Sequence, residues 1–311
     1  MATILSLPNE LLIDIFSYVA SDVRKSHVTA TLSPVCKIFH RVIQSSGIDV
    51  MYTPLRGIDR MQRFLDLVQD RELSQKRVYS LLLVVAGIED EDTTEDTLAL
   101  SMFETILSTI DASRLHTLFI YVPFAKDETP VLQLSVPLHA LTDLHLSGLL
   151  AVSPAGHPPH TPNLERVQLL RLYRLPPEAK DFPRFIHNLA PRLTQLKLSM
   201  LSPPESLMHR ISQFDDSVTR NVLHAKALYH KFPTSLRQIV ASFTYQRGDA
   251  ITLMHLIFRA REEAPAVEVT TSREGQLDHI PGSDEEDGVE AARIDGFALE
   301  WKSVSSGEES S

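Results

Sequence analysis

Apolar side chains in the first fifty residues recur at helical spacing in two separate stripes. Each stripe follows a short segment that ends in proline, Leu7-Pro8 in the first case and Ser33-Pro34 in the second. Proline suits the first turn of a helix, because the N–H group that it lacks would have no partner there. Gly47 follows the second stripe, and glycine commonly ends helices. We therefore predict two amphipathic helices, whose apolar stripes consist of Leu11, Leu12, Ile15, Phe16 and Val19 and of Val35, Ile38, Phe39, Val42 and Ile43.

A shorter pattern, with apolar residues at its first, fourth and sixth positions, recurs along the body of the chain. Its copies start at Val78, Leu115, Leu141, Leu164, Leu193 and Leu236. The starts lie 37, 26, 23, 29 and 43 residues apart. The middle three intervals fall in the range of about 20–29 residues that is typical of leucine-rich repeats. In such repeats each copy contributes a short strand and neighbouring strands stack in parallel, so we predict a parallel strand at each copy.

The copies depart from the leucine-rich pattern at position nine. Repeats of that kind usually hold asparagine or cysteine there. In this chain the position holds Ala86, Pro123, Leu149, Leu172, Leu201 and Thr244. We therefore predict a degenerate leucine-rich-repeat-like domain over residues 76–260, with an ordinary mixed α/β domain as the alternative.

The segments between and before these strands contain further periodic and proline-rich stretches. Helical periodicity predicts helices over residues 59–69, 94–110 and 205–232, the first of them within a helical linker that spans residues 49–75. Clustered prolines predict loops over residues 153–162, 175–183 and 202–204.

Charge divides the chain into a neutral body and an acidic tail. Residues 262–311 contain 14 acidic and three basic residues, a net charge of −11, whereas the remaining 261 residues hold 26 acids and 27 bases. We predict that residues 261–311 are largely disordered, except for a short strand over residues 294–301, where Phe297, Leu299 and Trp301 alternate. Serines beside acidic residues, in segments 283–287 and 305–311, are suited to phosphorylation by acidophilic kinases.

Two blocks in the first fifty residues resemble the F-box family in order and spacing. The first block is Leu7-Pro8-x-Glu10-Leu11-Leu12-x-x-Ile15-Phe16, and the second is Leu32-x-x-Val35-Cys36-Lys37-x-Phe39. Phe39 stands where many family members have tryptophan. The resemblance covers residues 4–48 and implies a three-helix F-box domain over residues 1–48. It also implies that an adaptor of the Skp type is bound by Leu7, Pro8, Glu10, Leu11, Leu12, Ile15, Phe16, Val35, Cys36 and Phe39.

An F-box followed by leucine-rich repeats implies an α/β fold in which a three-helix domain precedes an irregular solenoid of short parallel strands and an acidic disordered tail. It further implies a substrate-recognition subunit of an SCF-type (Skp-cullin-F-box) ubiquitin ligase. Such a subunit contacts cullin through the adaptor, and its repeats recruit a substrate protein, here of unknown identity. It is not an enzyme, because it acts by raising the local concentration of substrate. The alternative is a non-catalytic F-box scaffold that acts outside a ubiquitin ligase.

Candidate chemistry elsewhere in the sequence is sparse. His157 and His160 lie close together in a proline-rich segment without a nearby cysteine or carboxylate cluster, so we expect no metal site there. Cys36 has no neighbouring base, and glycine-rich phosphate loops are absent from the sequence, so we expect no cofactor. His139 and His145, beside a predicted strand, are expected on the surface.

Composition sets the expected environment of the chain. The neutral body lacks the clustered basic residues of a nucleic-acid-binding protein. The longest apolar run has about ten residues, half of what a bilayer span needs, so we expect no membrane partner. A single cysteine fits a reducing compartment, and we expect a cytoplasmic or nuclear protein.

Overall fold

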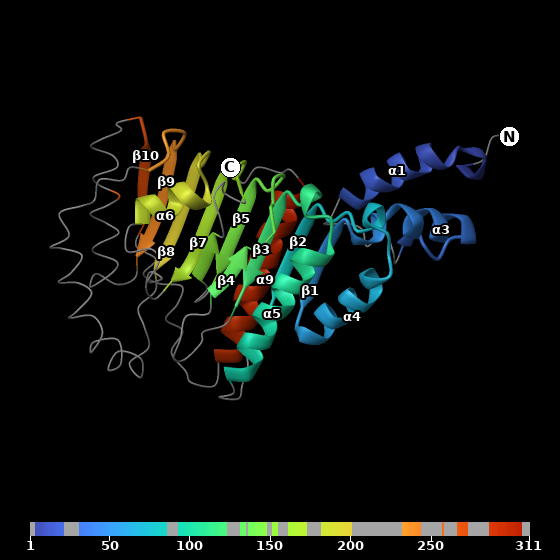
Figure 1. The fold of residues 1–311 in the computed structure, drawn as a ribbon, viewed down its shortest axis with the longest axis horizontal. Coiled ribbons are helices and arrows are strands. Elements are labelled where there is room, and N and C mark those ends of the chain that lie inside the picture. Colours follow the sequence, from blue (N-terminus) through green and yellow to red (C-terminus); the bar gives the residue numbers. More distant parts are fainter. Residues whose placement is uncertain are drawn as a thin grey trace.

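The chain folds into an α/β structure built on one eight-stranded parallel sheet (Figure 1). The computed structural model describes residues 4–21, 31–85, 93–122, 131–134, 136–147, 151–154, 161–172, 182–200, 232–243, 257, 266–272 and 286–306. The strands follow one another across the sheet as β1 (Tyr52–Arg56), β2 (Ser80–Val84), β3 (Thr117–Tyr121), β5 (Asp143–Ser147), β7 (Arg166–Leu172), β8 (Gln195–Met200), β9 (Gln238–Phe243) and β10 (Glu268–Ser272). Two further strands, β4 (Val131–Leu134) and β6 (Ala151–Pro154), pair with each other in parallel.

All six predicted copies of the repeat form strands of the large sheet. Residues at position four lie directly opposite one another on neighbouring strands, and they are Leu81, Leu118, Leu144, Val167, Leu196 and Ile239. Residues at positions one, four and six are buried in every copy. The predicted parallel strands and their register are therefore confirmed.

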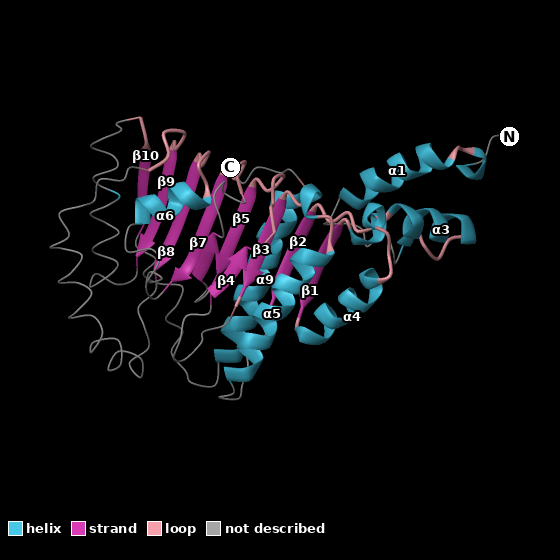
Figure 2. Cartoon of the chain, in the orientation of Figure 1, coloured by secondary structure: helices cyan, strands magenta, loops and turns pink. Residues whose placement is uncertain are grey.

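Helices cover the face of the sheet toward which the residues at positions four and six point. They are α4 (Ile58–Gln69), α5 (Thr93–Thr109) and α6 (Phe182–Leu189), and their buried residues belong to one cluster with the strand rows (Figure 2). The predictions for α4 and α5 are confirmed. Helix α6 begins inside the proline-rich stretch 175–183 that was predicted as a loop, because Pro183 falls in the first turn, where proline is tolerated.

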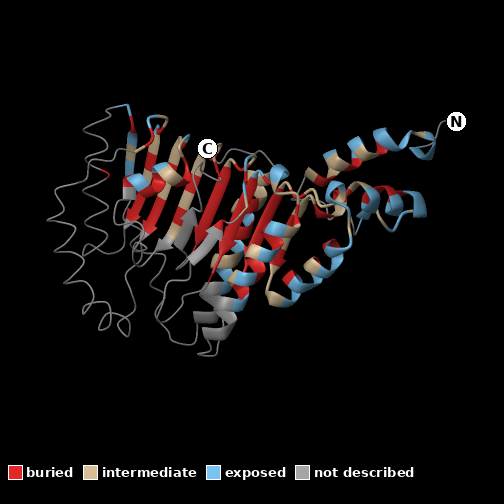
Figure 3. Cartoon of the chain, in the orientation of Figure 1, coloured by how far each residue is buried: buried red, intermediate tan, exposed pale blue. Residues whose placement is uncertain are grey.

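The opposite face of the sheet is covered by α9 (Glu286–Ser305), which packs on β2 and β3. Phe297, Ala298 and Trp301 of α9 form a second buried cluster with strand residues Leu82, Val84, Phe119 and Tyr121. With helices on both faces, β2, β3 and β5 are buried along their whole length (Figure 3). Among the described residues, no helix is long and apolar enough to cross a membrane.

Helix α9 corrects the prediction for the acidic tail. The strand predicted over residues 294–301 is wrong, and so is the expectation that the tail is largely disordered, since residues 286–305 are helical. Alternation of Phe297, Leu299 and Trp301 was misleading because Leu299 is 64% exposed on the outer side of the helix. The buried stripe instead follows helical spacing, with Phe297 and Trp301 four residues apart.

Four of the described strands were missed. β4 and β6 lie between predicted strands, and the end of β6 falls inside the loop predicted over residues 153–162, because its residues pair with β4. β1 lies in the predicted helical linker 49–75, and β10 lies in the predicted disordered tail. β1 is short and contains Pro54, which argues against a strand, but it lies at the edge of the sheet, where a missing N–H is tolerated. β1 and β10 are held by pairing with a neighbour, β1 with β2 and β10 with β9.

The N-terminal helices form a small unit beside β1. Within the described residues these helices are α1 (Asn9–Ser21) and α3 (Lys37–Ser46). Helix α3 ends at Gly47, as predicted, with a left-handed backbone (φ 73°) whose N–H donates to the carbonyls of Ile43 and Gln44. Residues 22–30, between these two helices, lie outside the described residues, so the three-helix form of the expected domain stays a prediction. His157, His160 and nearly all of the helix predicted over 205–232 also lie outside the described residues.

Candidate functional site

The two N-terminal helices enclose a small apolar core of their own. Leu12 and Phe16 of α1 and Phe39 of α3 are buried. The rings of Phe16 and Phe39 pack edge to face, with their centroids 4.8 Å apart. These three residues, predicted to contact an adaptor, hold the two helices together.

A second set of apolar side chains on the same helices is exposed. In α1, Leu11 is 48% and Ile15 40% exposed, and Tyr18, one turn further, is 81% exposed. Spacings of four and three residues place them on one side of the helix. Val35, before α3, is 63% exposed, and Ile38 in its first turn is also exposed.

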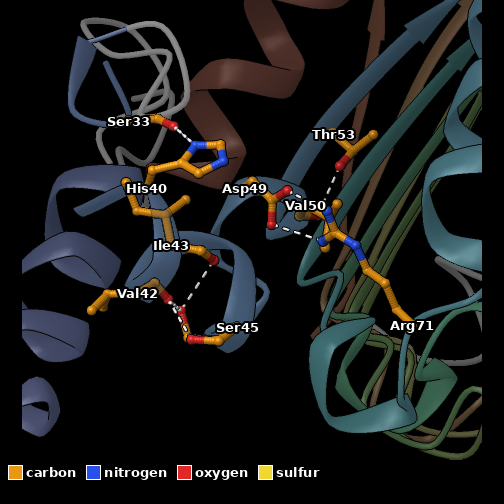
Figure 4. A network of polar contacts seen from close by, with 10 residues as sticks. Ser33, His40, Val42, Ile43, Ser45, Asp49, Val50, Thr53 and Arg71 are labelled. Carbon is orange, nitrogen blue, oxygen red and sulfur yellow. Dashed lines mark hydrogen bonds and ion pairs between the residues drawn. The ribbon is translucent and has the colours of Figure 1, made fainter. Parts of the chain in front are cut away.

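The remaining predicted contact residues lie around these exposed side chains. Pro8 and Glu10 are exposed, whereas Leu7 and Cys36 are half-buried and pack against the apolar core of the unit. Cys36 immediately precedes α3, has an extended backbone and provides no side-chain cap. Helix α3 therefore begins at Lys37, two residues after Val35, the first residue of the predicted apolar stripe. Ser33 Oγ lies 2.7 Å from His40 Nδ1 and links the preceding turn to α3 (Figure 4).

The sequence reasoning overlooked part of this exposed set. Ile4, Leu5, Tyr18 and Ile38 are exposed apolar residues that were not assigned to the surface. A signal was present, since an apolar stripe wider than one buried face leaves side chains without cover.

Polar contacts fix the helical unit to the sheet (Figure 4). Arg71, just after α4, donates two hydrogen bonds to the Asp49 carboxylate, at 2.9 and 2.6 Å. Thr53 in β1 donates to the Val50 carbonyl at 2.7 Å. Asp49 and Arg71 are both largely buried, and a paired, forked contact of this kind holds a fixed geometry. The helices that bear the exposed apolar side chains are thus held in a fixed position beside β1.

Beside α9 the outer face of the sheet becomes polar. His145 in β5 is only 1% exposed, so the expectation of a surface residue is wrong for His145 and confirmed for exposed His139. The imidazole stacks on Phe119 with the ring centroids 3.8 Å apart. Burial lowers the pKa of His145 well below its usual range, and the positive charges of Arg166 and Lys197 act in the same direction, while the Gln168 side chain opposes them.

Charged side chains surround this buried imidazole. Asp143 is buried and paired with Arg166, and Lys197 lies 3.8 Å from Glu300 of α9. Among the described residues, no group of three or more histidine, cysteine or acidic side chains is arranged to hold a metal ion. The exposed apolar side chains of α1 and α3 are therefore the strongest candidate for a site, and they suit protein binding.

No protein-family model, curated protein or solved structure matches the chain.

Proposed function

We propose that this chain is the substrate-recognition subunit of an SCF-type ubiquitin ligase. In this proposal α1 and α3 belong to a three-helix F-box that binds a Skp-type adaptor, and cullin is reached through that adaptor. The strand array is a degenerate leucine-rich-repeat-like solenoid that recruits a substrate protein. The mechanism is effective concentration, without bond chemistry in this chain.

One observation carries the proposal. Leu12, Phe16 and Phe39 already provide the core of the helical unit, and Leu11, Ile15 and Tyr18 remain exposed on one side of α1. Burial of large apolar side chains is favourable by about 1.5–3 kcal/mol each. An exposed apolar stripe on a rigidly held helix is therefore typical of a binding surface for another protein.

The sheet supplies the second half of the proposed receptor. On its outer face the side chains of Gln195 and Gln238 are half-exposed and joined by a hydrogen bond of 2.8 Å, and half-exposed Lys197 lies beside Glu300 of α9. They form an ordered row because β8 and β9 pair in register there. A rigid row of alternating strand side chains is suited to contact with a substrate protein.

The test is co-purification of the full chain with a Skp-type adaptor and cullin. In the double variant Leu11→Ser and Ile15→Ser, adaptor recovery should fall sharply, because truncation of central interface residues costs about 2 kcal/mol or more each, roughly 30-fold in affinity. Both side chains are exposed, so the melting temperature of the variant should match that of the wild type.

A matched control is available on the helices of the sheet. Leu67 of α4 is 48% exposed, the same fraction as Leu11, and Leu98 of α5 is similarly exposed. The double variant Leu67→Ser and Leu98→Ser should retain the adaptor. Equal adaptor recovery in the two double variants would rule out the proposed surface. Recovery of adaptor without cullin would indicate a scaffold outside a ligase.

A further inference from the structure

The last turn of α9 places a serine at the contact between this helix and the sheet. Ser305 Oγ lies 2.6 Å from Ser80 Oγ of β2. Ser80 Oγ also accepts a hydrogen bond of 2.7 Å from Trp301 Nε1. Ser80 and Trp301 are buried, and Ser305 is half-buried. These three side chains form one hydrogen-bonded chain that fastens the C-terminal end of α9.

The sequence around this serine suits a kinase that selects acidic targets. Glu308 follows Ser305 by three residues, and Glu309 follows Ser306 by three residues. Helix ends open locally at low cost compared with the core of a sheet. The end of α9 can therefore enter a kinase while the strands beneath it stay folded.

We propose that Ser305 is a phosphorylation site and that its modification detaches α9 from the sheet. The phosphoryl donor is ATP, bound by an acidophilic protein kinase. Ser305 Oγ forms a bond to the γ-phosphorus, the bond from that phosphorus to the bridging oxygen breaks, and ADP leaves. The hydroxyl proton passes to a base of the kinase.

The phosphate is incompatible with the docked position for two reasons. An oxygen 2.6 Å from Ser80 Oγ leaves no space for a phosphoryl group between them. The group also adds a charge of about −1.5 to −2 at a helix C-terminus, where negative charge is unfavourable. Lys302, one turn earlier in α9, offsets only part of that charge.

Detachment would uncover a patch of the sheet that is apolar and aromatic. Leu82, Phe119 and Tyr121 are now shielded by α9, and Phe297 packs against both rings with centroid distances of 5.0 and 5.6 Å. Phosphorylation at Ser305 therefore controls access to the outer face of β2 and β3.

The experiment uses the intact chain, an acidophilic serine kinase and ATP, with Trp301 fluorescence as the readout. Trp301 is the single tryptophan, so its emission reports the docking of α9 directly. Mass spectrometry locates the phosphate. We expect incorporation at Ser305 with a red shift of the emission maximum toward that of the unfolded chain, and reversal of the shift by a phosphatase.

Two variants distinguish this site from its neighbour. Ser306 Oγ donates to the Ser303 carbonyl of α9, within the C-terminal end of the same segment. The shift should persist in Ser306→Ala and be lost in Ser305→Ala. The proposal is overturned if native protein takes up no phosphate at Ser305, or takes it up without a shift in emission. Neither result bears on adaptor binding, so the two proposals fail separately.

Discussion

His145 shows how burial on a sheet controls the protonation of a single polar residue. Its imidazole stacks on the Phe119 ring, with Arg166 and Lys197 near enough to disfavour a further positive charge. No hydrogen bond of ordinary geometry joins its ring nitrogens to a described side chain. A neutral imidazole is tolerated in this position, and an imidazolium is not.

Acid should therefore destabilise the protein through this residue. The unfolded chain binds a proton at His145 with a pKa near 6.5, whereas the folded pKa is well below that value. As the pH falls below about 6.5, the unfolded state gains protons that the folded state does not bind, so stability decreases. Between about pH 7 and pH 5.5 the free energy of unfolding should lose about 1 kcal/mol from this site.

Urea unfolding at the two pH values measures this effect. In His145→Leu, the decrease between the two pH values should be smaller than in the wild type by that amount. His139 is exposed, so His139→Leu should show the same pH dependence as the wild type. A His145→Leu variant with an unchanged pH dependence would show that the imidazole takes up protons in the folded state just as it does in the unfolded chain.

Two glycines illustrate how an element constrains its residues. Gly47 ends α3 in a left-handed conformation, and a Cβ atom there would overlap the Gln75 carbonyl. Gly296 lies within α9 on its exposed side, and a Cβ atom would meet nothing within 4 Å. The same substitution should thus have opposite effects at the two positions.

Alanine at Gly47 should destabilise the protein by at least about 1–2 kcal/mol from the backbone conformation alone, with the overlap at Gln75 adding to that cost. Alanine at Gly296 should stabilise it by about 0.5–1 kcal/mol, because glycine is a poor residue inside a helix. Chemical denaturation of both variants beside the wild type measures the two changes. A loss of stability in Gly296→Ala would contradict the helical assignment of residues 286–305.

Within the described residues the sheet has an apolar cluster on each of its faces, in addition to the separate core of the N-terminal helices. The larger lies under α4, α5 and α6, and the smaller lies under α9. Residues of β2 and β3 contribute to both clusters, so these strands are packed on both faces. Helix α9 comes from the C-terminal end of the sequence and covers strands nearly two hundred residues earlier.

Removal of residues 286–311 should therefore weaken the fold and expose apolar surface. Burial of Phe297 and of Trp301 stabilises the fold by about 1.5–3 kcal/mol each. In the deletion variant this contribution is lost, and Leu82, Phe119 and Tyr121 become exposed. We expect a lower urea midpoint by circular dichroism and strong binding of an apolar dye. A shorter deletion of residues 307–311, which follow α9, serves as the control and should behave as the full chain. Equal midpoints for both deletions would mean that α9 contributes no stability.

Local pattern was sufficient wherever a segment buries its residues against its neighbours in sequence. The strands that follow Val78, Leu115 and Leu141 were predicted in register, because positions four and six are two residues apart and therefore face the same, buried side of a strand. The ends of α3 and α4 followed from glycine and from helical periodicity in the same way. Three of the predicted contact residues, Leu11, Ile15 and Val35, are exposed apolar side chains, as a binding role requires.

The remaining features depend on partners that are distant along the chain. β1 and β10 are strands because an open edge of a neighbouring strand accepts their hydrogen bonds. His145 is buried on the face that α9 covers in part, stacked on Phe119 of the neighbouring strand, and no property of its own segment indicates that neighbour. Helix α9 was missed because the acidic composition of the whole tail indicates disorder. Its packing on the sheet depends instead on one apolar stripe that includes Phe297 and Trp301. Periodicity is a local property of the chain, whereas coverage of a sheet face is a property of the assembled fold.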